Sequence, residues 1–206
     1  RMYELGVRMM TLTWNHENEL ASPQRNPGGV LVPQTEKGLT GKGFEFLAEM
    51  ERMHMIVDVS HLSDKGFWDI VEHGTRPFAA SHSNCRTLAP HTRNLTDEMI
   101  RALSERGGIA GLNYYAPFLD TDPTHPENCR STVELIAKHA GHYKQVGGAQ
   151  MIALGSDFDG IDGPHQLENA AFLPLLADAL RKEGFTEDEV EGIYYRNAMR
   201  FFEENL

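Results

Sequence analysis

Short, continuous apolar segments alternate with segments of helical period along this chain. The apolar segments lie at residues 6–13, 55–60, 77–81, 108–113 and 151–155. Amphipathic helices are predicted between them, over about 40–53, 64–74, 96–107 and 132–142. Continuous apolar strands joined by helices are typical of a parallel sheet that helices cover. The fold is therefore α/β, either an open doubly wound sheet or a (β/α)8 barrel.

The strand ends favour the barrel over the doubly wound sheet. No glycine-rich nucleotide-binding motif follows any strand, whereas polar side chains stand where a barrel carries its chemistry, at the carboxyl ends of the strands. A complete barrel takes roughly 250 residues and eight strands. Five strands are predicted in these 206 residues. We therefore expect one domain over residues 1–206, made of about the last five β/α units of a TIM barrel. Two helices close it, the second beginning with a capping box of Thr186 and Glu189.

Composition limits the classes of partner. The formal net charge is −11, which argues against nucleic acid or an anionic membrane as the main partner, because both need a basic surface. No apolar run reaches the length of a membrane span. The only cysteines are Cys85 and Cys129, which we expect to be free thiols in a reducing compartment. The first residues show no signal-peptide arrangement and are typical of the middle of a protein. The expected location is the cytoplasm.

Metal-binding side chain types follow three of the predicted strands. His61 ends the second strand and His82 ends the third, while Asp157 and Asp159 end the fifth. Neighbouring parallel strands lie about 4.8 Å apart, so side chains at equivalent heights can reach one ion. A zinc-type site uses imidazole and carboxylate ligands on rigid supports. A lone histidine at a strand end is usually structural, but two on successive strands favour a metal site.

Other polar residues have both a functional and an ordinary interpretation. Asp58 is interpreted as a buried, hydrogen-bonded aspartate rather than an outer partner of the metal site. His139 and His142 have the i, i+3 spacing of a chelating pair, but a solvated helix face is the preferred interpretation. His16 lies in an acidic loop after the first strand, which is either part of the site or simply a loop. Arg93, in the loop after the third strand, either clamps a substrate carboxylate through two hydrogen bonds or forms a salt bridge.

Several stretches together resemble the membrane (renal) dipeptidase family of zinc metallopeptidases, including its bacterial members. They are YELGVRMMTLTWNHENELA, GLTGKGFEFLAEMERMHMIVDVSHLS, FAASHSNCRTLAPHTRNLTDEMI, GGIAGLNYYAPFL, LGSDFDG and YYRNAMRFFE. They follow the family order over nearly the whole chain. The resemblance implies a metallo-dependent hydrolase barrel with two zinc ions that hydrolyses dipeptides and tolerates a D-residue at the C-terminal position.

The resemblance also implies roles for individual residues. His61 and His82 match the two histidines that hold one zinc, and Asp157 matches the aspartate that moves a proton from the attacking water to the leaving amine. Arg93 matches the arginine that binds the free carboxylate of the substrate. Asp159 and His16 match no assigned role.

Two departures from the family pattern limit what is carried over. The family's His-x-Asp pair and its bridging glutamate belong before YELGVRMMTLT, where this sequence starts at Arg1. The mammalian members carry a substrate-facing histidine directly after TLT, where this chain has Trp14. An indole offers one N–H donor and no acceptor.

The leading hypothesis is a zinc-dependent dipeptidase whose partner is a dipeptide substrate. The alternative is a catalytically incomplete remnant that acts as a binding or assembly subunit, as a homo-oligomer or with a complementing chain. A third hypothesis is another barrel amidohydrolase that acts on a lactone or a cyclic amide.

Overall fold

A five-stranded parallel sheet organises the chain. The computed structural model describes residues 1–24, 32–120, 128–163 and 165–206. In the described residues the strands pair in chain order, β1-β2-β3-β4-β5, and every neighbouring pair is parallel. They are β1 (Met9–Thr11), β2 (Ile56–Asp58), β3 (Ala79–Ala80), β4 (Ile109–Leu112) and β5 (Ile152–Leu154). The five predicted strands are confirmed, although each is shorter than the apolar segment that predicted it.

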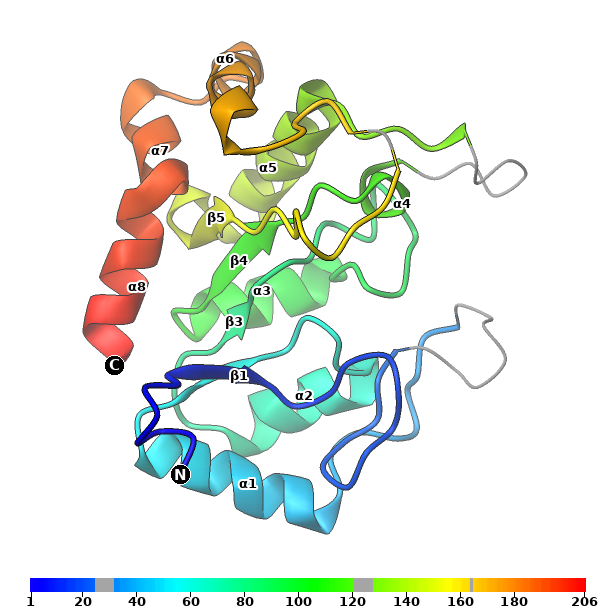
Figure 1. Cartoon of the computed structure of the whole chain (residues 1–206), viewed down its shortest axis with the longest axis vertical. Coiled ribbons are helices and arrows are strands. Elements are labelled where there is room, and N and C mark those ends of the chain that lie inside the picture. The colour runs from blue at the N-terminus through cyan, green and yellow to red at the C-terminus, as the bar shows by residue number, and fades with distance from the viewer. Residues whose placement is uncertain (25–31, 121–127, 164) are drawn as a thin grey trace.

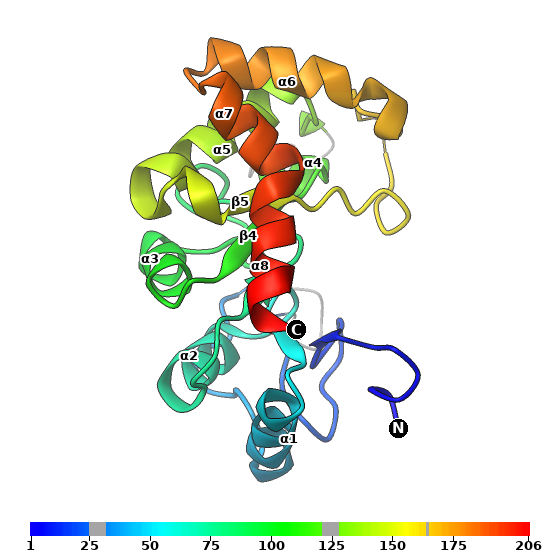
Figure 2. The same ribbon diagram turned by 90° about the vertical axis from the view of Figure 1, so that its left-hand side faces the viewer.

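Four helices cover one face of the sheet, α1 (Gly41–Arg52), α2 (Asp64–His73), α3 (Asp97–Glu105) and α5 (Val133–Gly147), and Figure 2 shows them along one side of it. Each begins after a residue whose hydroxyl accepts a hydrogen bond from a backbone N–H of the first turn, and these residues are Thr40, Ser63, Thr96 and Thr132. The short helix α4 (Ala116–Leu119), which follows β4, was not predicted.

The sheet buries apolar side chains on both faces. The main core lies between the sheet and the four helices and includes Val57, Ala80, Ala110 and Ile152. A second cluster on alternate strand positions packs Ile56, Ala79, Ile109 and Ala153 against Phe201. Because successive side chains of a strand point to opposite faces, burial on both faces requires the continuous apolar strands that the sequence shows.

The chain ends in further helices, the last of which lies at the amino ends of the strands (Figure 1). They are α6 (Leu173–Lys182), after the 3-10 turn η3 (Ala170–Phe172), then α7 (Glu187–Glu191), the π-helical segment η4 (Gly192–Arg196) and α8 (Asn197–Asn205). The predicted capping box of Thr186 and Glu189 is present. Asn197 donates to the carbonyls of Ala149, in the 3-10 turn η2 (Ala149–Met151), and of Ile152, at 2.9 and 2.8 Å. Figure 1 shows α8 at the amino ends of the strands and the loops that follow the strands at the opposite end.

The structure changes two predictions for α5, the position of its C-terminal end and the exposure of His139. The helix continues to Gly147, beyond the predicted end near His142, and stops at Gly148, whose φ is 91°. The interpretation of His139 as part of a solvated face is wrong, because His139 is fully buried. Its Nδ1 accepts from the backbone N–H of Cys85 at 3.1 Å, and its Nε2–H donates to the carbonyl of Leu119 at 3.1 Å. His139 therefore ties α5 to the loop after β3.

Other global features agree with the composition. Both cysteines are free thiols, Cys85 buried and Cys129 partly exposed. Among the helices in the described part of the chain, none is both long and apolar enough to cross a membrane.

Candidate metal and substrate site at the carboxyl ends of the strands

Two histidine side chains converge at the carboxyl ends of β2 and β3. His61 lies three residues after the end of β2, and His82 lies two residues after the end of β3. The Nε2 atom of His61 lies 2.9 Å from the Nε2 atom of His82. The structure thus brings the two predicted metal ligands together.

A buried hydrogen-bond chain fixes the tautomer of His82. The Asp58 carboxylate, which is buried as predicted, accepts the Oγ–H of Ser81 at 2.6 Å. With its single proton given to Asp58, the Ser81 hydroxyl accepts from Nδ1–H of His82 at 2.7 Å. A neutral imidazole protonated on Nδ1 carries a lone pair on Nε2. The chain Asp58–Ser81–His82 therefore leaves the Nε2 atom of His82 as an electron-pair donor.

Asn15 fixes the same tautomer in His61, with the proton on Nδ1. The carbonyl oxygen of the Asn15 side chain lies 3.2 Å from Nδ1 of His61 and accepts its proton, which leaves the lone pair on Nε2. Burial and the nearby Arg93 guanidinium lower the pKa of His61 to about 2 and also lower the pKa of His82, so both rings are neutral at pH 7. Two lone pairs that face each other at 2.9 Å cannot form a hydrogen bond, and a cation between them removes their repulsion. Neutral imidazoles are the ligands that zinc prefers among nitrogen donors, so the residues present fit a zinc ion.

Arg93 places a buried guanidinium beside this pair. Its Nη2 donates to Nε2 of His82 at 3.0 Å, and its guanidinium carbon lies 5.3 Å from the ring centre of Phe118. The side chain is 9% exposed, and its Nε and Nη1 have no hydrogen-bond partner among the described residues. Burial lowers the pKa of Arg93 to about 10, so the group stays charged at pH 7. A buried cation with unsatisfied donors is costly unless an anion joins it.

Asp157 reaches the same place from β5 through an unusual backbone conformation. Its φ is 63°, in the left-handed region that non-glycine residues rarely adopt. Such a strained residue persists only where its surroundings enforce it, and these cases cluster at functional sites. Asn113, directly after β4, donates from Nδ2 to Oδ2 of Asp157 at 3.1 Å. A β-carbon at Gly160 would overlap Oδ1 of Asp157, so any larger residue there would displace the carboxylate.

Asn113 was not identified from the sequence. Its backbone N–H and carbonyl are held by the side chain of Asn84, and its own Oδ1 accepts from the N–H of Tyr115. Asn113 is fully buried and thereby aims one N–H at Asp157. Its position in the sequence could have identified it. Asn113 is the polar residue that ends the fourth apolar segment, just as His61 and His82 follow the second and third segments.

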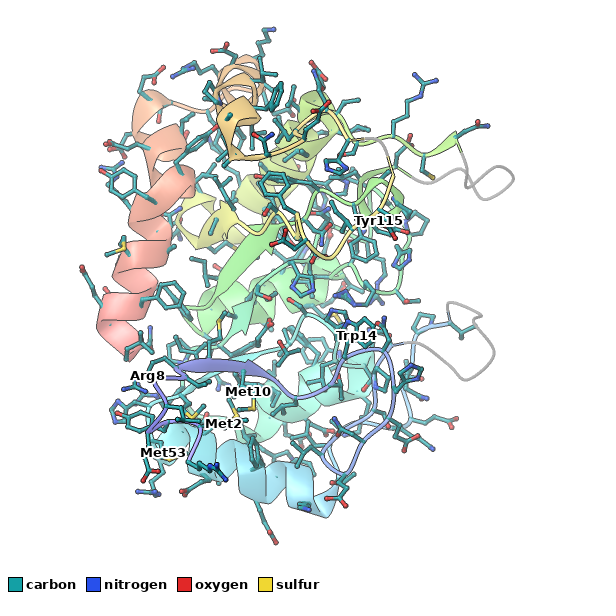
Figure 3. The ribbon with its side chains drawn as sticks, in the orientation of Figure 1. Met2, Arg8, Met10, Trp14, Met53 and Tyr115 are labelled. Atoms are coloured by element: carbon teal, nitrogen blue, oxygen red, sulfur yellow. The ribbon has the colours of Figure 1, made fainter. Side chains whose placement is uncertain are left out.

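The converging groups line a cleft of about 420 Å³. His61, Arg93 and Asp157 form part of its wall, and an adjoining hollow of about 470 Å³ adds His82. Trp14, which is 66% exposed, lines both. Figure 3 shows Trp14 and Tyr115 on the loops at this end of the sheet.

The two remaining candidates lie away from the cleft walls. His16 is exposed and contacts Trp14 edge-on, with ring centres 6.4 Å apart, but neither hollow is lined by it. Asp159 is exposed in the turn after β5. The strand ends at Leu154, so the alternation of strand side chains does not decide where Asp157 and Asp159 point.

Among the residues that the structure describes, one group of three acidic and histidine side chains lies close enough together to hold a metal ion. This group is on α2, away from His61 and His82. It consists of Asp69, Glu72 and His73 on α2. Asp69 already accepts from Lys65 and from the N–H of Leu39, and the other two side chains are exposed. No third carboxylate, thiolate or imidazole of the described residues joins His61 and His82.

Comparison with known proteins relates this chain to dipeptidases. The sequence profile of the membrane dipeptidase family, peptidase family M19, matches residues 1–205. A Klebsiella pneumoniae protein described as an uncharacterized protein in the pqqA 5′ region is 36% identical over 200 residues, which are 96% of this chain and 72% of that protein. An uncharacterized dipeptidase of Schizosaccharomyces pombe is 35% identical over 96% of this chain and 46% of its own length.

Solved structures share the fold. A metallopeptidase from Rhodobacter sphaeroides, crystallised with a phosphinate mimic of the dipeptide L-Ala-D-Ala, has 30% sequence identity and a TM-score of 0.88 over 100% of this chain and 57% of its own. The metallopeptidase dipeptidase AC has 31% identity and a TM-score of 0.87 over 99% of this chain and 60% of its own.

These matches confirm the predicted fold class, because the five β/α units superpose on part of metallo-dependent hydrolase barrels. The chain spans 57% and 60% of the two solved structures and about half of the fission-yeast relative. With the profile matching almost every residue, the chain belongs to the membrane dipeptidase family, peptidase family M19.

Proposed function

We propose that the protein is a zinc-dependent dipeptidase that hydrolyses the peptide bond of a dipeptide. The observation that carries the proposal is the pair of facing Nε2 lone pairs on His61 and His82, beside the buried Arg93 guanidinium whose Nε and Nη1 lack partners among the described residues. The first feature calls for a cation and the second for an anion. A dipeptide supplies the anion as its free carboxylate.

The chain's own residues divide the chemistry between them. Zinc held by His61 and His82 would act as a Lewis acid toward the scissile carbonyl and would lower the pKa of a water molecule. We propose two zinc ions in the intact protein, as the family resemblance implies. Arg93 orients the substrate by donating charge-assisted N–H hydrogen bonds to its carboxylate.

Asp157 moves the proton. A water molecule adds to the peptide carbonyl, the C–N bond breaks, and the proton that the water gives up must reach the departing amine nitrogen. The carboxylate of Asp157 can accept that proton and then donate it. Asn113 holds the carboxylate through Oδ2, which keeps the oxygen positions fixed during the transfer.

The size of the cleft and the relatives support the substrate class. A volume of about 420 Å³ lies at the low end of ligand pockets and suits a small molecule. We further propose that the C-terminal residue of the dipeptide can have the D configuration. Support comes from the Rhodobacter sphaeroides relative, whose structure holds an L-Ala-D-Ala mimic.

The proposal is tested with a dipeptide and its C-terminal amide in the intact, zinc-loaded protein. The amide lacks the charge that Arg93 binds, so kcat/KM for the amide should be lower by about 10²-fold, the scale of a lost charge-assisted hydrogen-bond pair. Arg93→Met should lower kcat/KM for the dipeptide and leave the amide unchanged. Arg52→Met is the matched control, because Arg52 only forms an exposed ion pair with Glu49. Equal hydrolysis of acid and amide by the parent protein would refute the proposal.

A second candidate function has one observation in its favour. Among the residues that the structure describes, His61 and His82 have no third metal ligand of the carboxylate, thiolate or imidazole type. The alternative is therefore a catalytically incomplete binding or assembly subunit. Elemental analysis of the purified protein separates the two, since the dipeptidase should hold close to two zinc ions and the remnant far less than one.

A further inference from the structure

We propose that Arg86 is the positioning residue that fixes Arg93 for the substrate carboxylate. Arg86 lies in the loop between β3 and α3, seven residues before Arg93. Its Nε donates to the carbonyl of Asn94 at 2.8 Å, and its Nη2 donates to the carbonyl of Thr92 at 2.8 Å. These carbonyls belong to the residues on either side of Arg93, so one guanidinium holds the backbone on both sides of the substrate-binding side chain.

The Nη1 and Nη2 atoms of Arg86 also bind the carboxylate of Asp64 at the start of α2. Nη1 donates to Oδ2 of Asp64 at 2.7 Å, and Nη2 donates to Oδ1 at 2.8 Å. Asp64 lies in the first turn of α2, and both side chains of the ion pair are largely buried, with 15% and 10% of their surface exposed. A planar guanidinium has the donors to bind a carboxylate with one edge and backbone carbonyls with the others, which an ammonium cannot do.

Asp64 connects three loops of the cleft. It belongs to the segment that follows His61, it pairs with Arg86 of the loop after β3, and it accepts from Nε2 of Gln24, in the loop after β1. Gln24 itself lines the cleft, and its backbone N–H donates to the carbonyl of His61 at 3.3 Å. The Asp64–Arg86 pair is thus a junction beneath the loops that carry Trp14, His61 and Arg93.

The energetics of buried ion pairs favour positioning over general stabilisation. The desolvation cost of such a pair offsets most of its attraction, so its net contribution to folding is small even when its geometry is strict. Arg86 is not among the residues that line the cleft. It acts on the substrate only through Arg93, whose guanidinium must be held at the cleft wall to bind a carboxylate.

The inference rests on the proposed function, and its test uses two variants of the intact, zinc-loaded protein. Arg86→Lys keeps the charge next to Asp64 but cannot bridge the carbonyls of Thr92 and Asn94. The KM for a dipeptide should rise about 10-fold, with kcat changed by less than about 3-fold, because the carboxylate is bound equally in the ground and transition states. The KM for the dipeptide amide should not change. Asp64→Asn, which removes the anchor but preserves its shape, should shift KM in the same direction.

Hydrogen–deuterium exchange provides a readout that is independent of activity. In Arg86→Lys the amides of residues 92–95 should exchange at least about 10-fold faster, while those of β2 and β4 stay unchanged. Arg52→Lys, which alters the exposed Arg52–Glu49 pair, is the matched control for both measurements and should behave like the parent protein.

The outcomes separate this inference from the proposed function. If the parent protein prefers the acid over the amide but Arg86→Lys shows the same preference, or if exchange at residues 92–95 is unchanged, the positioning role is wrong and the dipeptidase proposal stands. Equal KM increases for acid and amide, or faster exchange throughout the sheet, would show a general structural role and also overturn the inference. If the parent protein shows no preference for the acid, the dipeptidase proposal fails, and the exchange result alone decides whether Arg86 fixes the Arg93 loop.

Discussion

Arg93 donates through Nη2 to Nε2 of His82 across 3.0 Å. The residue that resembles the carboxylate clamp of the family therefore touches a residue that resembles a zinc ligand. The single lone pair on His82 Nε2 can serve Arg93 or a metal ion, but not both. In the proposed function, an ion at His82 would leave Nη2 of Arg93 free for the substrate, so zinc binding and carboxylate binding should depend on each other at this contact.

Replacement of either converging histidine should lower zinc retention. His61→Ala and His82→Ala each remove one lone pair from the 2.9 Å contact, so we expect each variant to lose at least about 10-fold in zinc affinity, measured by titration against a chromogenic chelator. His73→Ala is the control, because His73 is exposed and belongs to the other group of candidate ligands on α2. Loss of zinc in the His73 variant, with retention in the other two, would move the site to α2.

Loss of the Ser81 hydroxyl should weaken the metal site without removing a ligand. Ser81→Ala breaks the chain from Asp58 to His82, so the His82 tautomer and ring orientation are no longer fixed. Outer partners of this kind contribute about 10- to 100-fold in metal affinity, and we expect a loss in that range. Ser104→Ala, which loses one hydrogen bond to Gly147 at a distant surface, should bind zinc like the parent protein. Parental affinity in the Ser81 variant would contradict the role of the hydrogen-bond chain.

Neutralising Asp157 should slow catalysis and leave binding intact. Asn at this position keeps the shape and the contact region of Asn113 but cannot carry a proton, so kcat should fall by roughly 10²-fold or more with little change in zinc content. Asp159→Asn is the matched control, because that carboxylate is exposed in the following turn. Steady-state kinetics of the two variants in the intact protein distinguish them. A low kcat in the Asp159 variant, combined with a normal Asp157 variant, would reverse the assignment of the proton carrier.

Acid should destabilise the metal-free protein through its buried histidines. Burial lowers the pKa of His139 from its ordinary value of 6.5 to about 4. Between these values the unfolded chain binds a proton that the folded chain excludes, so this stabilising contribution is complete above pH 6.5 and is lost as the pH falls toward 4. His139→Gln should therefore reduce the pH dependence of the unfolding free energy by up to about 1.4 kcal/mol per pH unit. Urea denaturation between pH 7 and pH 4.5 measures this slope.

The control for the acid experiment is the exposed histidine of α2. His73→Gln changes a side chain that is 52% exposed in the folded protein and is measured beside the His139 variant for comparison. The absolute stability of the His139 variant does not enter the comparison, because only the slope reports the missing proton. An unchanged slope in His139→Gln would show that this ring is protonated as easily in the folded chain as in the unfolded one.

Local features of the fold could be predicted from the sequence because neighbouring residues determine them. The apolar segments and the starts of the helices near Thr40, Thr96 and Thr132 depend on interactions within one strand or one helical turn. The same is true of the Thr186 capping box. The positions of His61, His82 and Asp157 after strands followed from this pattern, and the parallel order of the sheet placed them at one end. Their individual roles came from the family resemblance.

The tertiary structure decided which side chains meet. Whether His139 faces water or the core depends on what packs against α5, and the loop after β3 occupies that face. The contact between Asn113 and Asp157 joins residues 44 positions apart, and the left-handed backbone at Asp157 overrides the alternation that a longer strand would have imposed. Likewise, nothing within a few residues of Arg86 indicates that Asp64 will anchor it. Propensity and spacing describe a chain over one or two turns, whereas a site forms where distant segments close on one another, and that closure depends on the packing of the entire sheet.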